Sequence, residues 1–181
     1  MILEAVFLGL YLSAVVSLVV YTYSTGISPV PSTRRARARV FELVPEGAAG
    51  TIVDLGSGWG TLAFRLARRH PACRVVGYEL SPVPWLFSQA RRLVQPRPNL
   101  ALLRKDFFGV PLSGAAIVVC YLWPEGMRRL REKFERELTP GTIVVSNHFP
   151  VPGWKPAATL PVGDFFTREV YLYRIPPPPA E

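Results

Sequence analysis

The sequence predicts one doubly wound α/β domain around a mostly parallel, seven-stranded, Rossmann-like sheet, preceded by one N-terminal transmembrane helix. Strand-like runs alternate with helix-like segments, which indicates βαβ units. Apolar runs such as IVDL and AIVVCY are continuous rather than alternating, as in strands buried on both faces. A length of 181 residues allows one such domain with short accessory segments.

The transmembrane helix is predicted over residues 1–24. Its centre, Ala5–Val20, carries no charge and is apolar on every face. With its flanks it reaches about 20 residues, the length that crosses a bilayer core, and Tyr21 and Tyr23 would lie at the interface. A cleaved signal peptide fits less well, because Glu4 and no Lys or Arg precedes the apolar run.

The expected orientation follows from a cluster of arginines just after the apolar segment, whereas none precedes it. The cluster consists of Arg34, Arg35, Arg37 and Arg39. The positive-inside rule then places the catalytic domain on the cytoplasmic side of the membrane. Anionic headgroups near these side chains would account for part of the net charge of +8.

A Pro/Ser/Gly linker over 25–33 leads into the main domain, expected over 34–175, and the polyproline tail 176–181 is expected to be disordered. The expected elements are helix Arg34–Val44, strand Thr51–Leu55, helix Thr61–Arg69, strand Arg74–Glu79, helix Trp85–Val94, strands Leu100–Arg104 and Ala115–Tyr121, helix Glu125–Leu138, and strands Thr142–Ser146, Thr159–Val162 and Phe166–Ile175. No helix pattern separates the last two strands, so we expect an antiparallel pair at the sheet edge.

Metal and disulfide chemistry are not expected. Cys73 and Cys120 form no CxxC motif, and Cys120 falls inside an apolar run, where a buried thiol is the ordinary interpretation. His70 and His148 are far apart and lack metal-ligand spacing.

The first chemical signal is the segment Asp54–Gly60, DLGSGWG, which ends a strand and opens a helix. Its glycines let the backbone turn sharply at the sheet edge where open α/β folds bind ligands. The GxGxG spacing differs from the GxGxxG of dinucleotide folds. Asp54 would repel a pyrophosphate, whereas it would attract the amino group of a methionine moiety.

Acids recur at the next two strand ends. Glu79 can accept the hydroxyls of a ribose, and Asp106 can accept from an adenine amine with Phe107 or Phe108 available for stacking. Taken alone, Asp54 could be a helix cap, Glu79 a solvated strand end and Asp106 a turn residue. Three acids at successive strand ends indicate an adenosine that carries a cationic amino-acid tail.

With these residues the chain resembles the class I S-adenosylmethionine methyltransferases. More narrowly, it resembles the family of the mitochondrial lysine methyltransferases of ATP synthase subunit c and of the adenine nucleotide translocase, with their prokaryotic relatives. The resemblance covers about residues 28–157. It rests on the membrane segment and on Pro31-Ser32, Asp54–Gly58, Gly77–Pro82, Trp85-Leu86, Asp106-Phe107, Glu135–Leu138 and Phe149–Trp154. Trp59, His148 and an apparent insertion at Val83-Pro84 depart from the pattern.

The resemblance implies S-adenosyl-L-methionine as cofactor and assigns residues to it. They are Asp54, Gly56, Ser57, Gly58 and Gly60 for the methionine part, Glu79 for the ribose, and Asp106 and Phe107 for the adenine, with Leu80 as a further contact to the cofactor. It also implies that Tyr121, Trp123 and Pro124, after the fourth strand, position the methyl acceptor.

A lysine acceptor must be neutral to react, against a free pKa of about 10.4. An aromatic mouth of Tyr121, Trp123, Phe149 and Trp154 would lower that pKa by excluding water. We find no general base, since His148 is expected to make an ordinary hydrogen bond.

We therefore expect a membrane-anchored S-adenosylmethionine-dependent methyltransferase that methylates a lysine of a membrane protein. Two alternatives stay open: an enzyme acting on a quinone, lipid or other small hydrophobic acceptor, and a non-catalytic protein that binds S-adenosylmethionine. No basic stripe interleaved with aromatics appears, so a nucleic-acid partner is not expected.

Overall fold

A computed structural model of the chain describes Glu4, Val16 and residues 32–165 and 167–177. Apart from Glu4 and Val16, the predicted transmembrane segment lies outside these described residues. Among the helices that are described, none has the length and apolar character needed to cross a bilayer. The predicted tail also falls largely outside the described part of the chain.

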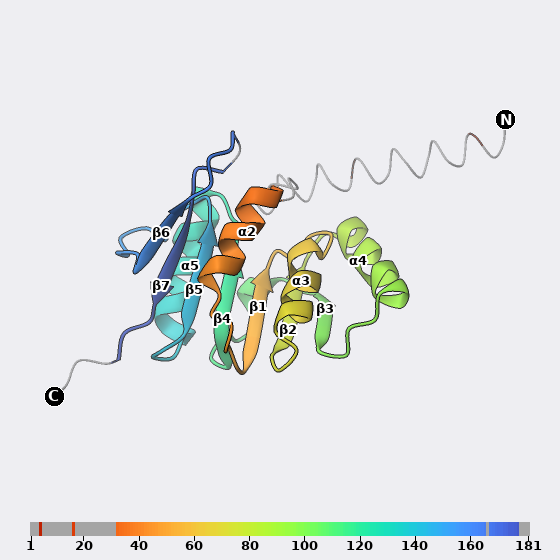
Figure 1. The fold of residues 1–181 in the computed structure, drawn as a ribbon, viewed down its shortest axis with the longest axis horizontal. Helices are drawn as coiled ribbons and strands as arrows, with labels where there is room; N and C mark the ends of the chain where they lie inside the picture. The colour runs from red at the N-terminus through yellow and green to blue at the C-terminus, as the bar shows by residue number, and fades with distance from the viewer. Residues whose placement is uncertain (1–3, 5–15, 17–31, 166, 178–181) are drawn as a thin grey trace.

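The described chain forms one mixed sheet in the order β3-β2-β1-β4-β5-β7-β6 (Figure 1). Its strands are β1 Thr51–Leu55, β2 Arg74–Glu79, β3 Leu100–Arg104, β4 Ala115–Cys120, β5 Ile143–Asn147, β6 Ala158–Pro161 and β7 Glu169–Arg174. Strands β1 to β5 are mutually parallel, whereas β7 runs antiparallel to β5 and β6. The predicted mostly parallel sheet and its terminal antiparallel pair are confirmed, with β6 as the outer strand.

Helices cover both faces of the sheet (Figure 1). One face carries α2 Arg34–Leu43, α3 Thr61–Arg69 and α4 Pro82–Val94, and the other carries α5 Pro124–Glu137. Successive strand residues alternate between the two cores: Ile52 packs with the α2 and α3 residues, and Val53 packs with those of α5. Burial on both sides explains why the strand sequences are continuously apolar.

Two helices begin earlier than expected because proline suits the first helical turn, where its missing N–H has no intrahelical acceptor. Helix α4 starts at Pro82 and α5 at Pro124. The residues Val83-Pro84, which looked like an insertion, are the first turn of α4. Helix α2 begins as predicted after Thr33, whose hydroxyl accepts from the Ala36 N–H at 3.1 Å.

A largely buried ion pair, with side chains that are 3% and 24% exposed, holds α5 against the β3–β4 connection. Lys133 donates to both oxygens of Glu137 at 2.7 and 2.8 Å, and to the Phe108 carbonyl at 3.1 Å. Glu137 also accepts from the Leu112 N–H at 3.0 Å. Burial raises the pKa of Glu137, but the contacts with Lys133 and Leu112 outweigh it and hold the pKa below its ordinary value.

Replacing Lys133 with Met should lower the free energy of unfolding at pH 7 by about 2 to 4 kcal/mol, because Glu137 loses its counter-ion and the Phe108 carbonyl its donor. Since the folded-state pKa of Glu137 is depressed, the pair stabilises the fold above the ordinary pKa of 4.5. The difference from the unchanged chain should therefore shrink as the pH falls below that value. Urea unfolding at pH 7 and pH 4 measures both effects.

Arg128→Met is the matched control, because Arg128 pairs with Glu125 on the exposed side of the same helix. Its effect should stay below about 1 kcal/mol. Equal losses in the two variants would show that the buried pair contributes nothing beyond an ordinary surface contact.

Candidate cofactor and acceptor site

The turn from β1 into α3 needs glycine at three positions. Gly56, Gly58 and Gly60 have φ values of 79°, 52° and 73°, in the left-handed region that other residues rarely adopt. The N–H groups of Gly56 and Ser57 donate to the Tyr78 carbonyl at 3.0 and 2.9 Å, which ties the turn to β2. The predicted glycine-rich turn thus lies at the carboxyl edge of the sheet, at the start of α3.

Gly77 in β2 makes room for this turn. A Cβ at Gly77 would lie 2.9 Å from the Ser57 Cβ and 2.8 Å from the Leu102 side chain. Gly77 was not among the predicted site residues. A lone glycine inside a strand was the available signal, because it often marks a close backbone approach.

Glu79 at the end of β2 is 6% exposed and rigidly held. One carboxylate oxygen accepts from the Gly58 N–H at 2.8 Å, and the other accepts from the Ser81 N–H at 2.7 Å. A carboxylate has about four acceptor positions, so two backbone donors fix its orientation and leave lone pairs for hydroxyl groups of a ligand.

Asp54 lies beside Glu79 with one oxygen that has no partner. The residue is 4% exposed, and its Oδ2 is buried without a hydrogen bond. Burial first, and then the charge of Glu79, raise the pKa of Asp54 to about 7, against a smaller opposing effect of a backbone hydrogen bond from Ala63. A cationic group placed here would satisfy the free oxygen and favour the ionised carboxylate.

The adenine side of the predicted site begins at the exposed residue Asp106. Its side chain accepts from the Phe108 N–H at 2.9 Å and caps the short helix η1, Phe107–Gly109. Phe107 is buried in the core against Phe108, with ring centroids 4.7 Å apart, and the Arg129 guanidinium lies 4.0 Å from the Phe108 ring centroid. The Leu80 carbonyl nearby accepts from Arg104 at 3.3 Å.

The predicted acceptor residues follow β4. Tyr121 is half-buried, and its ring is stacked with that of Phe149, with the two ring centroids 6.4 Å apart. Trp123 is 53% exposed and precedes α5, and Pro124 is the first residue of that helix. Tyr121 and Phe149 are thus brought together.

Trp154 is placed differently from Tyr121 and Phe149. Its ring packs against Phe134 at 6.0 Å and Tyr173 at 5.7 Å, and its indole N–H donates to Glu135 at 3.2 Å. These contacts join α5 to β7. Trp154 therefore helps to pack α5, because its ring and its indole N–H contact residues of α5 and β7.

His148 has a strained backbone and an occupied ring nitrogen. It is the one non-glycine residue in the described chain with a positive φ, 73°. Its Nδ1 accepts from the Arg168 N–H at 3.3 Å, so the neutral ring carries its proton on Nε2. Burial first, and then Arg168, lower the pKa of His148. In this tautomer the ring has no free lone pair with which to act as a base.

The expected strand ended at Ser146 and left Asn147 to the following loop, whereas Asn147 is the last residue of β5 and 2% exposed. Its Nδ2 donates to the Ser32 hydroxyl at 3.0 Å, and its Oδ1 is buried without a partner. Because Ser146 pairs with Cys120, Asn147 comes opposite Tyr121 at the carboxyl ends of β5 and β4. No periodic signal distinguishes Asn147, because only the register of two distant strands places it here.

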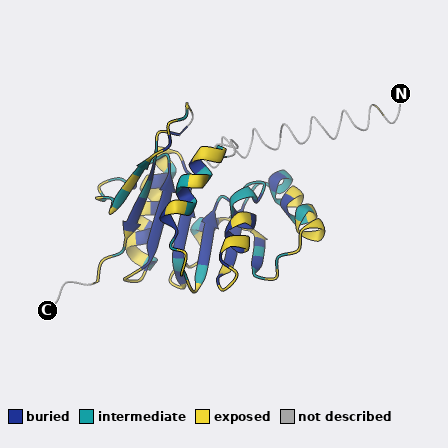
Figure 2. Ribbon diagram, viewed as in Figure 1, coloured by how far each residue is buried: buried dark blue, intermediate teal, exposed yellow. Residues whose placement is uncertain are grey.

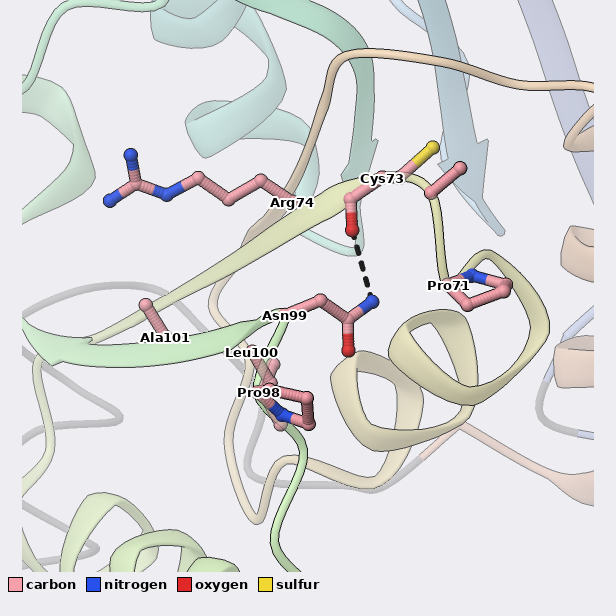
Figure 3. Close-up of a pocket in the computed structure, with 8 residues that line it drawn as sticks. Pro71, Cys73, Arg74, Pro98, Asn99, Leu100 and Ala101 are labelled. Carbon is pink, nitrogen blue, oxygen red and sulfur yellow. Dashed lines mark hydrogen bonds between the residues drawn. The ribbon is translucent and has the colours of Figure 1, made fainter.

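A hollow of about 490 Å³ opens at the other end of the sheet, around Pro71–Arg74 and Pro98–Ala101 (Figure 3). The amide of Asn99 donates there to the carbonyls of Ala67, His70 and Cys73 at 3.0 to 3.1 Å. These bonds satisfy the carbonyls at the end of α3 and the turn after it. The Asn99 amide therefore has a structural role, and the hollow lies away from the acids at the carboxyl edge.

The carboxyl edge fits S-adenosylmethionine on the chemistry of its donor set. The unpartnered oxygen of Asp54 suits a cationic amino group, and the oriented carboxylate of Glu79 suits a pair of hydroxyls. The roles assigned to single residues remain predictions. Among the described residues, no group of three His, Cys, Asp or Glu could hold a metal ion.

Comparison with known proteins points to the same chemistry. The family model of the ANTKMT methyltransferase domain matches residues 54–158. A protein-lysine N-methyltransferase of Saccharolobus islandicus is 27% identical over 85% of this chain and 97% of its own length. The adenine nucleotide translocase lysine N-methyltransferase of Mus musculus is 36% identical, over 71% of this chain and 55% of its own length. The chain therefore spans about half of that mouse relative.

A solved structure supports the methyltransferase fold and S-adenosylmethionine as the cofactor. The RNA methyltransferase of Salinibacter ruber, in complex with S-adenosyl-L-homocysteine, superposes with a TM-score of 0.73 and 32% sequence identity, over 81% of this chain and 94% of that one. The three acids and the glycine turn lie in the segment that the family model matches. The chain thus belongs to the ANTKMT methyltransferase domain family and is an S-adenosyl-L-methionine-dependent methyltransferase.

Proposed function

We propose that this enzyme methylates the side-chain amine of a lysine, which enters between the carboxyl ends of β4 and β5. The observation that carries the proposal is the unpartnered, buried Oδ1 of Asn147 opposite Tyr121. A buried acceptor without a donor costs free energy, so such an oxygen suits a ligand that brings N–H groups. A neutral lysine amine brings two.

S-adenosylmethionine supplies a methyl group that is already activated on a sulfonium, so the protein mainly has to position the acceptor and exclude water. The Oδ1 of Asn147 would accept a hydrogen bond from one N–H of the amine and thereby aim the lone pair of the amine nitrogen at the methyl group. Tyr121 and Phe149 would surround the amine with apolar surface and favour its neutral form. Burial, and then the charge of Asp164, raise the pKa of Tyr121, so its hydroxyl stays protonated.

The proton of the lysine ammonium must leave before transfer, because an ammonium nitrogen has no lone pair with which to attack the methyl carbon. His148 is not placed to take this proton, since its Nδ1 already accepts from the Arg168 N–H. We propose that the proton is lost to solvent as the amine enters the mouth. Desolvation by the aromatic rings and the positive charge of the cofactor both favour this loss.

For the substrate, we propose a lysine on a membrane protein. Support comes from the translocase named by the mouse relative and from the apolar segment Ala5–Val20, which would anchor the enzyme at a membrane with its domain on the cytoplasmic side. A second candidate is RNA, favoured by the name of the Salinibacter neighbour and by its 94% coverage.

Transfer of a radiolabelled methyl group from S-adenosylmethionine tests this function. Full-length enzyme is incubated with membranes and total RNA, and the label is counted in protein, RNA and organic extract. We expect label in a discrete protein band, on lysine by mass spectrometry, and its loss with Glu79→Ala. Label confined to RNA or to the organic extract would instead assign a nucleic-acid, quinone or lipid acceptor.

Binding of S-adenosylhomocysteine should release a fraction of a proton at pH 6.5. Asp54, whose pKa is about 7 in the free protein, is partly protonated there, and a cationic amino group would favour its ionised form. The affinity for S-adenosylhomocysteine should therefore rise as the pH increases from 6 to 7.5. Calorimetry in two buffers of different ionisation enthalpy counts the proton, and Asp54→Asn should abolish the release. Proton release that persists in the variant would assign it to another group.

Asn147→Ala should lower kcat on the order of tenfold or more, since the acceptor amine loses one hydrogen bond. The affinity for S-adenosylhomocysteine should stay unchanged, because Asn147 lies on the acceptor side. Ser32→Ala is the matched control: it removes only the hydroxyl that receives the amide N–H, so kcat should fall less. Equal kcat in Asn147→Ala and the parent enzyme, both folded, would contradict the assigned role.

A further inference from the structure

Helix α4 exposes an apolar face that the fold covers only in part, at Phe87, whose ring packs edge-on against Trp59 with centroids 5.2 Å apart. Pro84 and Ser88 point to the sheet, and the Trp85 indole donates to the Leu102 carbonyl at 3.2 Å. The opposite side shows residues at helical spacing that are all exposed: Leu86, Phe87, Ala90, Leu93 and Val94. Leu93 and Val94 are 86% and 81% exposed. Figure 2 shows exposed positions along α4, which lies at one end of the domain. Scattered apolar side chains are ordinary on a surface, but a continuous stripe indicates a binding face.

Arginines flank this stripe, and α4 contains no acid. Arg92 is exposed, and Arg91 lies over the Phe64 ring, 4.3 Å from its centroid. Burial first, and then the charges of Arg65 on α3 and Arg97 after α4, lower the pKa of Arg91. These arginines are therefore close enough to repel one another.

The positive region extends across α3 to α2. Burial, and then Arg65 and Arg34, lower the pKa of Arg37. On the same side of the sheet, Glu42 and Glu46 already pair with Arg39 at 2.7 Å and Arg69 at 2.9 Å. A basic surface thus runs over α2, α3 and α4, and it borders the apolar stripe.

We propose that this face of the domain, with the α4 stripe Leu86, Phe87, Ala90, Leu93 and Val94 at its centre, docks on an anionic lipid bilayer. Exposed Leu, Phe and Val side chains would enter the boundary between headgroups and acyl chains, as in amphipathic interfacial helices. The surrounding arginines would contact anionic headgroups, each contributing on the order of 1 kcal/mol. Arginine suits this position because its long apolar stem can lie along the membrane surface.

A second copy of the chain fits this face less well. A two-fold interface would set the stripe against itself and bring Arg91 and Arg92 of both copies together, with no acid on α4 to pair with them. RNA also fits less well, because the most exposed residues of the stripe, Leu93 and Val94, are aliphatic and cannot stack on bases.

The contact adds to the proposed function, but its test does not depend on methyl transfer. The chain's anchor, if inserted, would bring any variant to a bilayer, so the depth of α4 is measured rather than binding. Leu93→Cys is labelled with a nitroxide in the full-length protein, and Glu132→Cys on the exposed side of α5 serves as control. Cys73 and Cys120 are both 1% exposed and should remain unlabelled.

The labelled proteins are reconstituted in vesicles of phosphatidylcholine with phosphatidylglycerol, and collisions with oxygen and with a water-soluble nickel chelate are compared. We expect the label at position 93 to lose accessibility to nickel severalfold and to gain accessibility to oxygen, while the label at 132 changes little. Arg65→Gln with Arg92→Gln should weaken this protection.

Three results would overturn the proposal. The label at 93 could stay as accessible to nickel as the label at 132, which would place α4 in water. Dipolar broadening between labels at 93 that depends on protein concentration would assign the face to a second copy. Protection by RNA without vesicles would assign it to a nucleic acid. Methyl transfer is assayed separately on the same variants. This assay distinguishes a failure of the membrane contact from a failure of the proposed function.

Discussion

The burial of two carboxylates side by side at the ends of β1 and β2 is the constraint on which the site depends. Asp54 and Glu79 repel each other in an environment that already disfavours charge, and the raised pKa of Asp54 shows that cost. The fold offsets part of it with the backbone donors of Gly58 and Ser81. The positive φ angles of the turn and the absence of a side chain at Gly77 both serve to bring these donors to Glu79.

The acceptor side depends on three segments that are distant in the sequence. Asn147 at the end of β5 contacts Ser32, and Thr33 beside it contacts Asp164 in the β6–β7 connection. The chain therefore enters the domain at the edge where the acceptor is proposed to bind. An anchor before residue 32 would tie that edge directly to a membrane.

The two faces of the sheet differ in how their charges are balanced. On α5, arginine and lysine pair with glutamate one turn away, at Arg128–Glu125, Arg131–Glu135 and Lys133–Glu137. On α2, α3 and α4, arginines lie near other arginines, and the apolar stripe of α4 lies beside them. This asymmetry accounts for much of the net charge of +8 and is the basis for placing the two faces in different surroundings.

The sequence by itself determined the parallel sheet, its antiparallel end, the glycine turn and the order of the three acids, because hydrophobic periodicity and strand-end residues are local signals. It misjudged the start of α4, where proline was taken for an insertion, and it left Asn147 in a loop. Only the tertiary structure decided that Asn147 comes opposite Tyr121 at the ends of neighbouring strands, that Trp154 packs on α5, and that the apolar side of α4 points outward. These features depend on register and on which helix face meets the sheet, and both are set by contacts between residues far apart in the chain.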